Sequence, residues 1–152
     1  MASYIRDGRA PIPAKASTSR LMQANKAKNT KPEMLLRKAL WLAGIRGYRL
    51  HSSALPGKPD IAFTKLKLAI FINGCFWHRC PKCDLPLPRS NTDFWREKFN
   101  ANIVRDQKKV RALRKAGWHT ITIWECQLLS GMGKAVKQIE RAIRKRKRVC
   151  LQ

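Results

Sequence analysis

The chain has 152 residues, of which 44% are hydrophobic, so it is long enough to fold as one domain around a single core. Its 33 Lys and Arg residues against 9 Asp and Glu residues give a formal net charge of +24. Such an excess repels itself, and it indicates a polyanionic partner more than a surface that serves solubility alone. No run approaches the roughly 20 apolar residues of a membrane span and no secretory signal is recognisable, so we expect a cytoplasmic protein without membrane association.

The N-terminal part predicts an arm followed by helices. Residues 1–16 combine two prolines in Ala-Pro-Ile-Pro with basic residues and show no periodicity, which predicts a flexible basic arm. Residues 19–27 could form a short helix. A stronger helix is predicted over residues 30–43, because Thr30 and Glu33 have the spacing of a capping box at its start.

The rest of the chain predicts alternating strands and helices. We expect strands over 48–52, 61–63 and 68–72, a helix over 93–116, a strand over 118–124 and a helix over 132–145. This order predicts an α/β fold in which helices cover both faces of a mixed central sheet. It forms one domain over residues 17–146, between the basic arm and a basic tail over residues 147–152.

Clustered cysteines predict a metal site, because disulfides are unusual in a reducing compartment. Cys80 and Cys83 form a C-x2-C pair, and Cys75 precedes that pair by five residues. A tetrahedral zinc ion needs a fourth ligand, which could be Cys126 or His78. Reduced structural cysteines or a redox pair are the alternatives.

Asp60 follows a proline where a turn leads into the strand predicted over 61–63. A carboxylate there can bind Mg²⁺ while water and phosphate take the remaining coordination positions. The alternative is an ordinary turn residue, since aspartate favours turns. The strand over 68–72 delivers the polar and aromatic segment 73–78 toward the same edge of the sheet, which favours the metal site.

Several segments carry a resemblance to a known family: 55–60 (LPGKPD), 71–78 (FINGCFWH), 94–95 (FW), 102–106 (NIVRD) and 117–126, which ends in Trp-Glu-Cys. Together they closely resemble the very-short-patch repair (Vsr) endonucleases over about residues 17–130. The resemblance implies a restriction-endonuclease-like fold of the PD-(D/E)xK group. It also implies a Mg²⁺-dependent enzyme of the bacterial cytoplasm or nucleoid. Such an enzyme acts on double-stranded DNA, recognises the T:G mismatch left by deamination of 5-methylcytosine, and nicks 5′ to the mismatched thymine.

The resemblance implies roles for four residues by position. Asp60 would bind Mg²⁺ together with the backbone carbonyl of Ile72. His78 would transfer a proton near the attacking water, a role that suits an imidazole because its ordinary pKa is close to neutral. Asp106 would help to orient His78, and its alternative is an ion pair with Lys109 on a helix face.

Other polar residues of the same region fit the family less completely. Asn73 stands where relatives often have histidine, and an amide cannot transfer a proton, so it could only position water or phosphate. Glu33 could support the catalytic site, but the capping box is sufficient to explain it and is the preferred interpretation. The chain lacks the ExK element of PD-(D/E)xK enzymes, as the family does, and His78 would replace the lysine. His51 and His119 match no functional pattern and are expected on strand surfaces.

The resemblance also implies that the cysteines of the segment 71–83 bind zinc and that its aromatic residues contact DNA. It implies a zinc site made of Cys75, Cys80, Cys83 and Cys126, whereas relatives commonly include a histidine. Four thiolates would close the coordination shell, so this zinc would be structural.

Phe76, Trp77 and Trp95 resemble the family's intercalating wedge. Aromatic side chains inserted beside a mismatch replace lost base stacking. For Trp95, burial in the core is the alternative.

Two other functions remain open from the sequence. One is a related nuclease with a different lesion or sequence specificity, and the other is a non-catalytic, zinc-containing DNA-binding module. We expect a monomer, because no apolar stripe is left unassigned. Mismatch-repair proteins are partners that the family resemblance implies.

Overall fold

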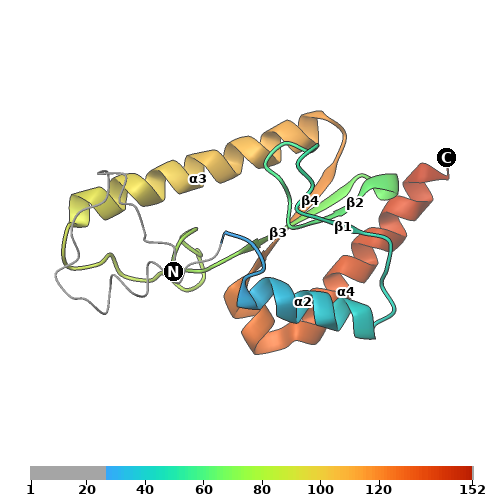
Figure 1. Cartoon of the computed structure of the whole chain (residues 1–152), viewed down its shortest axis with the longest axis horizontal. Helices are drawn as coiled ribbons and strands as arrows, with labels where there is room; N and C mark the ends of the chain where they lie inside the picture. The colour runs from blue at the N-terminus through green and yellow to red at the C-terminus, as the bar shows by residue number, and fades with distance from the viewer. Residues whose placement is uncertain (1–26, 152) are drawn as a thin grey trace, which may run out of the picture.

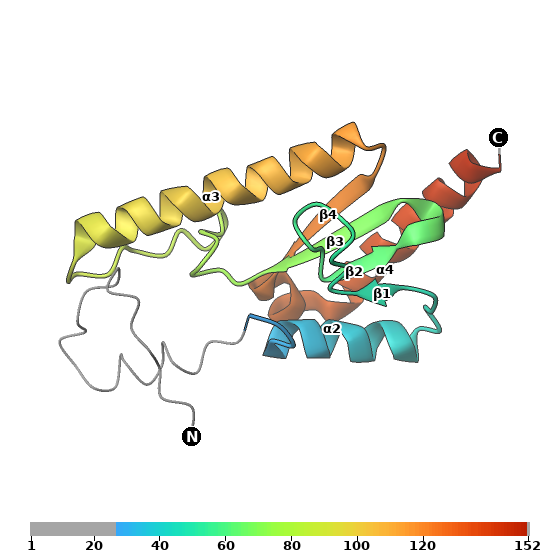
Figure 2. The same ribbon diagram turned by 45° about the horizontal axis from the view of Figure 1, so that its top comes forward.

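The computed structural model describes residues 27–151. The predicted arm over 1–16 and all but the last residue of the helix predicted over 19–27 lie outside the described residues. The described part is a four-stranded sheet with α3 on one face and α2 and α4 on the other, as Figures 1 and 2 both show. Helices therefore cover both faces, as predicted, while the single-domain boundaries stay a prediction.

The sheet has the order β1-β2-β3-β4 and mixes strand directions. Its strands are β1 (Arg49–Leu50), β2 (Ile61–Phe63), β3 (Leu68–Asn73) and β4 (His119–Trp124). The β1–β2 and β2–β3 pairs are antiparallel, whereas β3 and β4 are parallel. Short connections serve the antiparallel pairs, including the 3-10 turn η1 (Thr64–Leu66). The parallel pair needs a long crossover, which α3 (Thr92–Lys115) supplies.

The central strand β3 is buried along almost its whole length because both of its faces are covered. Leu68, Ile70 and Ile72 belong to the larger core cluster, which contains buried residues of α2 (Lys31–Leu42) and α4 (Glu125–Cys150). Ala69 and Phe71 belong to a smaller cluster with Leu113 of α3. The continuous apolar run that predicted a buried strand is therefore explained by helices on both sides.

The start of α2 differs from the predicted capping box. The Thr30 side chain does not cap the helix, and its hydroxyl instead donates to Glu33 Oε1 at 3.0 Å. Glu33 Oε2 does reach back, but it accepts from the backbone N–H of Asn29 at 3.0 Å. The prediction was wrong for Thr30 because the buried Glu33 carboxylate uses the hydroxyl proton as part of a larger polar cluster.

Helix α4 is longer than predicted at both ends. The prediction over 132–145 missed the segment from Glu125, where the helix continues across the extended residue Gly131 (φ −169°, ψ 62°). Leu128 is buried in the core and holds this first part against the sheet despite the glycines. Residues 147–150 of the predicted tail are the last helical turn. Although α4 has 26 residues, no helix among residues 27–151 is long and apolar enough to cross a membrane.

The packing of α3 on the sheet predicts a stability difference between two positions of that helix. Leu113 is fully buried against β3, so Leu113→Ala should lower the free energy of unfolding by about 2–5 kcal/mol through lost burial and a cavity. Val104 on the same helix is 63% exposed, and Val104→Ala should change it by less than about 0.5 kcal/mol. Urea denaturation followed by circular dichroism measures both, and equal effects would contradict the packing.

Candidate active site and metal centre

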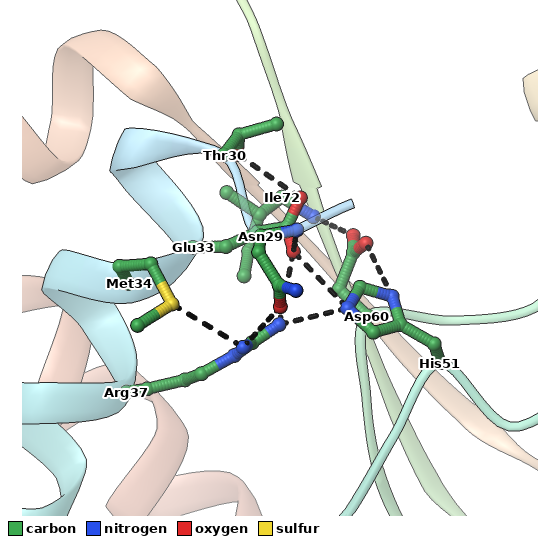
Figure 3. Close-up of polar contacts among 8 residues, drawn as sticks. All are labelled: Asn29, Thr30, Glu33, Met34, Arg37, His51, Asp60 and Ile72. Carbon is green, nitrogen blue, oxygen red and sulfur yellow. Dashed lines mark hydrogen bonds and ion pairs between the residues drawn. The ribbon is translucent and has the colours of Figure 1, made fainter. Parts of the chain in front are cut away.

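Asp60 directly precedes β2, and its side chain is hydrogen-bonded to β3. Its Oδ2 accepts a hydrogen bond from the backbone N–H of Ile72 at 2.7 Å (Figure 3). The other oxygen, Oδ1, lies 3.8 Å from Nδ1 of His51. One carboxylate oxygen is therefore held by the sheet, while the second faces a polar cluster.

Glu33, His51 and Asp60 point toward one another from three separate elements (Figure 3). Glu33 comes from the first turn of α2, where it is only 2% exposed, and its Oε2 lies 3.3 Å from His51 Nε2. One ligand atom from each of the three residues can be chosen so that all lie within 4.8 Å of one another. Arg37 closes the cluster on the α2 side, with its guanidinium 3.0 Å from Glu33 and 2.8 Å from His51.

The expectation for His51 was wrong, because its side chain belongs to this polar cluster and not to a free strand surface. The sequence predicted strands over 48–52 and 61–63 but not their pairing, and it is the antiparallel pairing of β1 with β2 that brings His51 to Asp60. Leu50 of β1 pairs with Ile61 of β2 in antiparallel direction. His51, which follows Leu50, therefore lies opposite Asp60, which precedes Ile61. The backbone N–H of His51 indeed donates to the carbonyl of Asp60 at 3.2 Å. His119 is exposed on β4, as expected.

The electrostatics around Asp60 favour a bound cation. Burial raises the pKa of Asp60 above its ordinary value of 3.8, and the Glu33 carboxylate raises it further. The Ile72 amide and the positive side chains nearby offset only part of this effect. Because carboxylates are hard oxygen ligands and Oδ1 accepts no hydrogen bond among the described residues, the donor set fits a divalent ion such as Mg²⁺.

His78 and Asp106 form a second polar pair, which α3 and the segment after β3 bring together. His78 Nδ1 lies 2.5 Å from Asp106 Oδ2, and Lys109 Nζ lies 3.5 Å from the other carboxylate oxygen. Asp106 therefore contacts both residues that the sequence named as its alternative partners, His78 and Lys109. Burial alone would raise the pKa of Asp106, but the hydrogen bond and charge of His78, together with Lys109, outweigh it and lower the pKa. The lowered pKa favours the ionised form of Asp106, whose carboxylate accepts from Nδ1 of the His78 ring.

Four cysteines gather into one cluster, consisting of Cys75, Cys80, Cys83 and Cys126. All four sulfurs lie within 4.8 Å of one another, and those of Cys80 and Cys126 are 3.8 Å apart. Tetrahedral zinc with Zn–S bonds of about 2.3 Å places its sulfurs about 3.8 Å apart, so the group can hold zinc. Among the described residues, the fourth member is Cys126 and not His78.

The thiols of this cluster differ in acidity in a way that also fits a cation. Burial, and then hydrogen bonds from neighbouring thiols, raise the pKa of Cys75 to about 12, so a thiolate there needs a compensating positive charge. Burial acts in the same direction at Cys80, but the backbone N–H groups of Cys83 and Lys82 bond to its sulfur and lower its pKa. Amides that face the sulfur of a C-x2-C pair stabilise the thiolate that zinc requires.

The aromatic residues form one packed group between the cysteine loop and α3. Phe76 and Trp77 are half-buried, whereas Trp95 is 5% exposed and lies behind them, with ring centroids 5.7 Å and 6.0 Å away. Trp95 thus takes the core position that the sequence left open. Asn102 of α3 anchors the loop by donating to the carbonyl of Trp77 at 2.9 Å.

Comparison with known proteins relates this arrangement to one family. The profile of the DNA mismatch endonuclease Vsr family matches residues 11–84. The type II nicking enzyme V.XorIIP of Xanthomonas oryzae pv. oryzae is 44% identical over 108 residues, which cover 71% of this chain and 79% of that relative. The DNA mismatch endonuclease Vsr of Escherichia coli K12 is 34% identical over 119 residues, which cover 78% and 76%. The chain belongs to the Vsr family.

This Vsr-family protein is therefore a DNA endonuclease, as the resemblance implied. A non-catalytic DNA-binding module no longer fits. The matched residues 11–84 contain Asp60, Asn73 and His78, whereas Asp106 and Cys126 lie beyond them and reach the site only through the fold. The described contacts join Asp60 to the Glu33 cluster and His78 to Asp106, and the segment 72–78 connects the two groups.

The cysteine cluster predicts zinc in the purified endonuclease. Cys126→Ser should abolish stoichiometric zinc and lower the melting temperature, because it removes one ligand of a closed tetrahedral site. Cys150→Ser is the matched control, since Cys150 is exposed and outside the cluster, and it should keep both properties. Metal analysis and thermal denaturation measure the two effects. Wild-type zinc content in Cys126→Ser would contradict the site.

Proposed function

We propose that this protein is a Mg²⁺-dependent nicking endonuclease that recognises T:G mismatches from deamination of 5-methylcytosine. It cleaves 5′ to the mismatched thymine and so starts very short patch repair. The observation that carries the proposal is that one continuous segment, 72–78, links the carboxylate Asp60 to the oriented histidine His78. The same segment contains a cysteine of the metal cluster and the half-buried aromatics.

The fold that we propose is the restriction-endonuclease-like one. What supports it is a mixed sheet in which Asp60 precedes the second strand of a β1–β2–β3 meander. A helix packs on either side of the sheet, and β4 joins β3 in parallel. The next strand, β3, has neither the acid nor the lysine of the ExK element. Its end instead leads to Asn73 and, five residues later, to His78.

In the proposed site, Mg²⁺ would be held by Asp60 Oδ1 and the backbone carbonyl of Ile72. When bound, Mg²⁺ supplies charge neutralisation at the scissile phosphate and a more acidic water. The Ile72 amide keeps the Asp60 carboxylate in one orientation through the 2.7 Å hydrogen bond. Glu33 stays in place through Arg37 and supports the site from the α2 side.

The proton-transfer group that we propose is His78. Asp106 accepts from Nδ1 at 2.5 Å, which leaves Nε2 as the ring nitrogen that would take a proton from the attacking water. Asn73 would position that water or a phosphate oxygen through its amide. The charge of Asp106 also stabilises the imidazolium that forms when Nε2 takes the proton of the water.

Mismatch recognition is assigned to Phe76 and Trp77, with Trp95 as their support. Phe76 packs edge to face on both Trp77 and the buried Trp95, whereas Trp77 is tilted against Trp95, and the half-buried pair forms a wedge that can enter the base stack. A mismatched pair costs less to unstack than a Watson–Crick pair, which favours T:G sites. Lys98 on α3 lies 5.6 Å from the Trp77 ring and can meet a phosphate beside the wedge. The net charge of +24 supplies the general attraction to DNA.

A second candidate is a related nicking enzyme with a different lesion or sequence specificity. What favours it is that the relative named a type II nicking enzyme is 44% identical, against 34% for the one named a mismatch endonuclease. The monomeric state and the cytoplasmic location remain predictions from the sequence, and contact with mismatch-repair proteins remains a prediction of the family resemblance.

A cleavage panel tests the proposed activity. Duplexes with T:G, U:G, G:C or A:T in matched sequence contexts are incubated with the protein with and without Mg²⁺. We expect Mg²⁺-dependent nicking of the T:G duplex alone or far above the others. Equal cleavage of G:C and T:G would favour the second candidate, and no cleavage of any duplex would contradict the proposal.

In the same assay, Asp60→Asn should reduce nicking by at least about 10²-fold, because the neutral amide binds a divalent ion poorly. Asp93→Asn is the matched control, since that side chain is 94% exposed at the start of α3. It should nick at the wild-type rate. An Asp60→Asn variant as active as the control would remove Asp60 from the metal site.

Asp106→Asn tests the orientation of His78. The amide keeps the size of the side chain but loses the charge that stabilises the imidazolium, so kcat should fall by about 10²-fold while KM changes little. Thermal denaturation checks that the variant is folded, and Asp93→Asn again controls for the same change on the same helix. A kcat equal to wild type would show that His78 acts without Asp106.

A further inference from the structure

We propose that His51 is a direct ligand of the catalytic divalent ion through Nδ1, with Glu33 orienting its ring, so that the site prefers Mn²⁺ or Co²⁺ to Mg²⁺. This inference rests on the proposed function, because it concerns the same ion at Asp60. Nothing in the motifs of the sequence pointed to His51, which comes from the loop after β1. The argument depends on the contacts of its two ring nitrogens.

The gap between His51 Nδ1 and Asp60 Oδ1 is within about 1 Å of the separations that two ligands of a shared ion have. The two atoms are 3.8 Å apart, which is too long for a hydrogen bond. Two ligand atoms that each lie about 2.1 Å from one ion are about 3.0 Å apart at right angles and about 4.2 Å apart when opposite. The observed separation falls between these limits, and the second oxygen of Asp60 is already engaged by Ile72.

The other ring nitrogen, Nε2, meets a buried carboxylate. Glu33 Oε2 lies 3.3 Å away and is itself held by Arg37 and by the backbone N–H of Asn29. A histidine that binds a metal usually donates its second N–H to a carboxylate, which sets the ring orientation and strengthens the ligand. Glu33 stands where such a carboxylate would accept the N–H once His51 Nδ1 binds an ion.

The contact with Arg37 determines which ring nitrogen of His51 carries the proton before an ion binds. A guanidinium only donates, so its 2.8 Å contact makes Nε2 an acceptor and assigns the ring proton to Nδ1. When Nδ1 binds the ion, the proton moves through solvent to Nε2 and the ring stays neutral. Glu33 Oε2 then accepts the Nε2–H, and the Arg37 guanidinium gives up its 2.8 Å contact with Nε2 and turns to Glu33, with which it already forms an ion pair.

A ligand set with one imidazole differs in metal preference from a set made only of oxygens. Mg²⁺ prefers oxygen ligands in a regular octahedron, whereas imidazole favours transition metals, and affinity rises from Mn²⁺ to Co²⁺. His51 therefore should make the endonuclease bind Mn²⁺ and Co²⁺ more tightly than Mg²⁺. Replacing His51 should reduce that difference.

Pulsed electron paramagnetic resonance of Mn²⁺ bound to the full-length, zinc-loaded protein tests the assignment without an activity assay. We expect the nitrogen coupling of a directly bound imidazole in the wild type, and its replacement by ¹⁵N coupling after labelling with ¹⁵N-histidine. Absence of this coupling in Mn²⁺-loaded wild type would overturn the proposal, and that result depends on no variant. His51→Gln should lose the coupling and bind Mn²⁺ about 10–100-fold more weakly.

His119→Gln is the matched control, since His119 is exposed on β4 and outside the cluster. It should keep both the coupling and the wild-type affinity for Mn²⁺. A coupling that persists in His51→Gln would also overturn the assignment. The variant Asp60→Asn distinguishes failure of the His51 assignment from failure of the proposed function. If Asp60→Asn weakens Mn²⁺ binding but the wild type shows no nitrogen coupling, only the assignment of His51 as a ligand is overturned. Mn²⁺ binding that is unaffected by Asp60→Asn overturns the catalytic metal site itself.

Discussion

The hydrogen bond from the Ile72 amide to Asp60 Oδ2 joins the two parts of the molecule that carry the candidate site. Asp60 precedes β2, and Ile72 is near the end of β3, so the bond ties the candidate metal ligand to the strand that continues into the cysteine loop. Because β3 is buried on both faces, its end has little freedom to move. Small shifts of the metal ligand relative to the segment 73–78 are therefore resisted by the whole core.

The parallel pairing of β3 and β4 brings together the residues that follow the two strands. Asn73 pairs with Trp124, so Cys75 and Cys126 each come two residues after a paired position. The Cys126 amide donates to the sulfur of Cys75 at 3.4 Å. The crossover helix α3 closes the other side, with Asp106 against His78 and Asn102 against the Trp77 carbonyl. The loop is thus held from two directions, and the four sulfurs of the cysteine cluster group together without His78.

Much of this arrangement could be predicted from local sequence patterns. The apolar run predicted a strand over 68–72, and the observed β3 extends one residue further. The helix predicted over 93–116 corresponds to α3, whose observed bounds are one residue earlier at each end. The C-x2-C pair was recognisable because its ligands are close in sequence. The start of α4 was missed because glycines weaken helical periodicity, and burial of Leu128 overrides them. Thr30 failed as a cap because Glu33 belongs to a cluster with residues far along the chain.

The sequence by itself determined the family, the excess of positive charge and the order of the elements, and it predicted Asp60, His78 and Asp106 as site residues. Motif residues and short-range periodicity depend only on neighbours in the chain, so they can be read without coordinates. Only the tertiary structure decided that Cys126 completes the sulfur cluster, that Trp95 is buried, and that His51 faces Asp60 and Glu33. Each of these facts depends on strand register and helix packing between distant segments, because a shift of one residue in a strand turns every side chain to the opposite face.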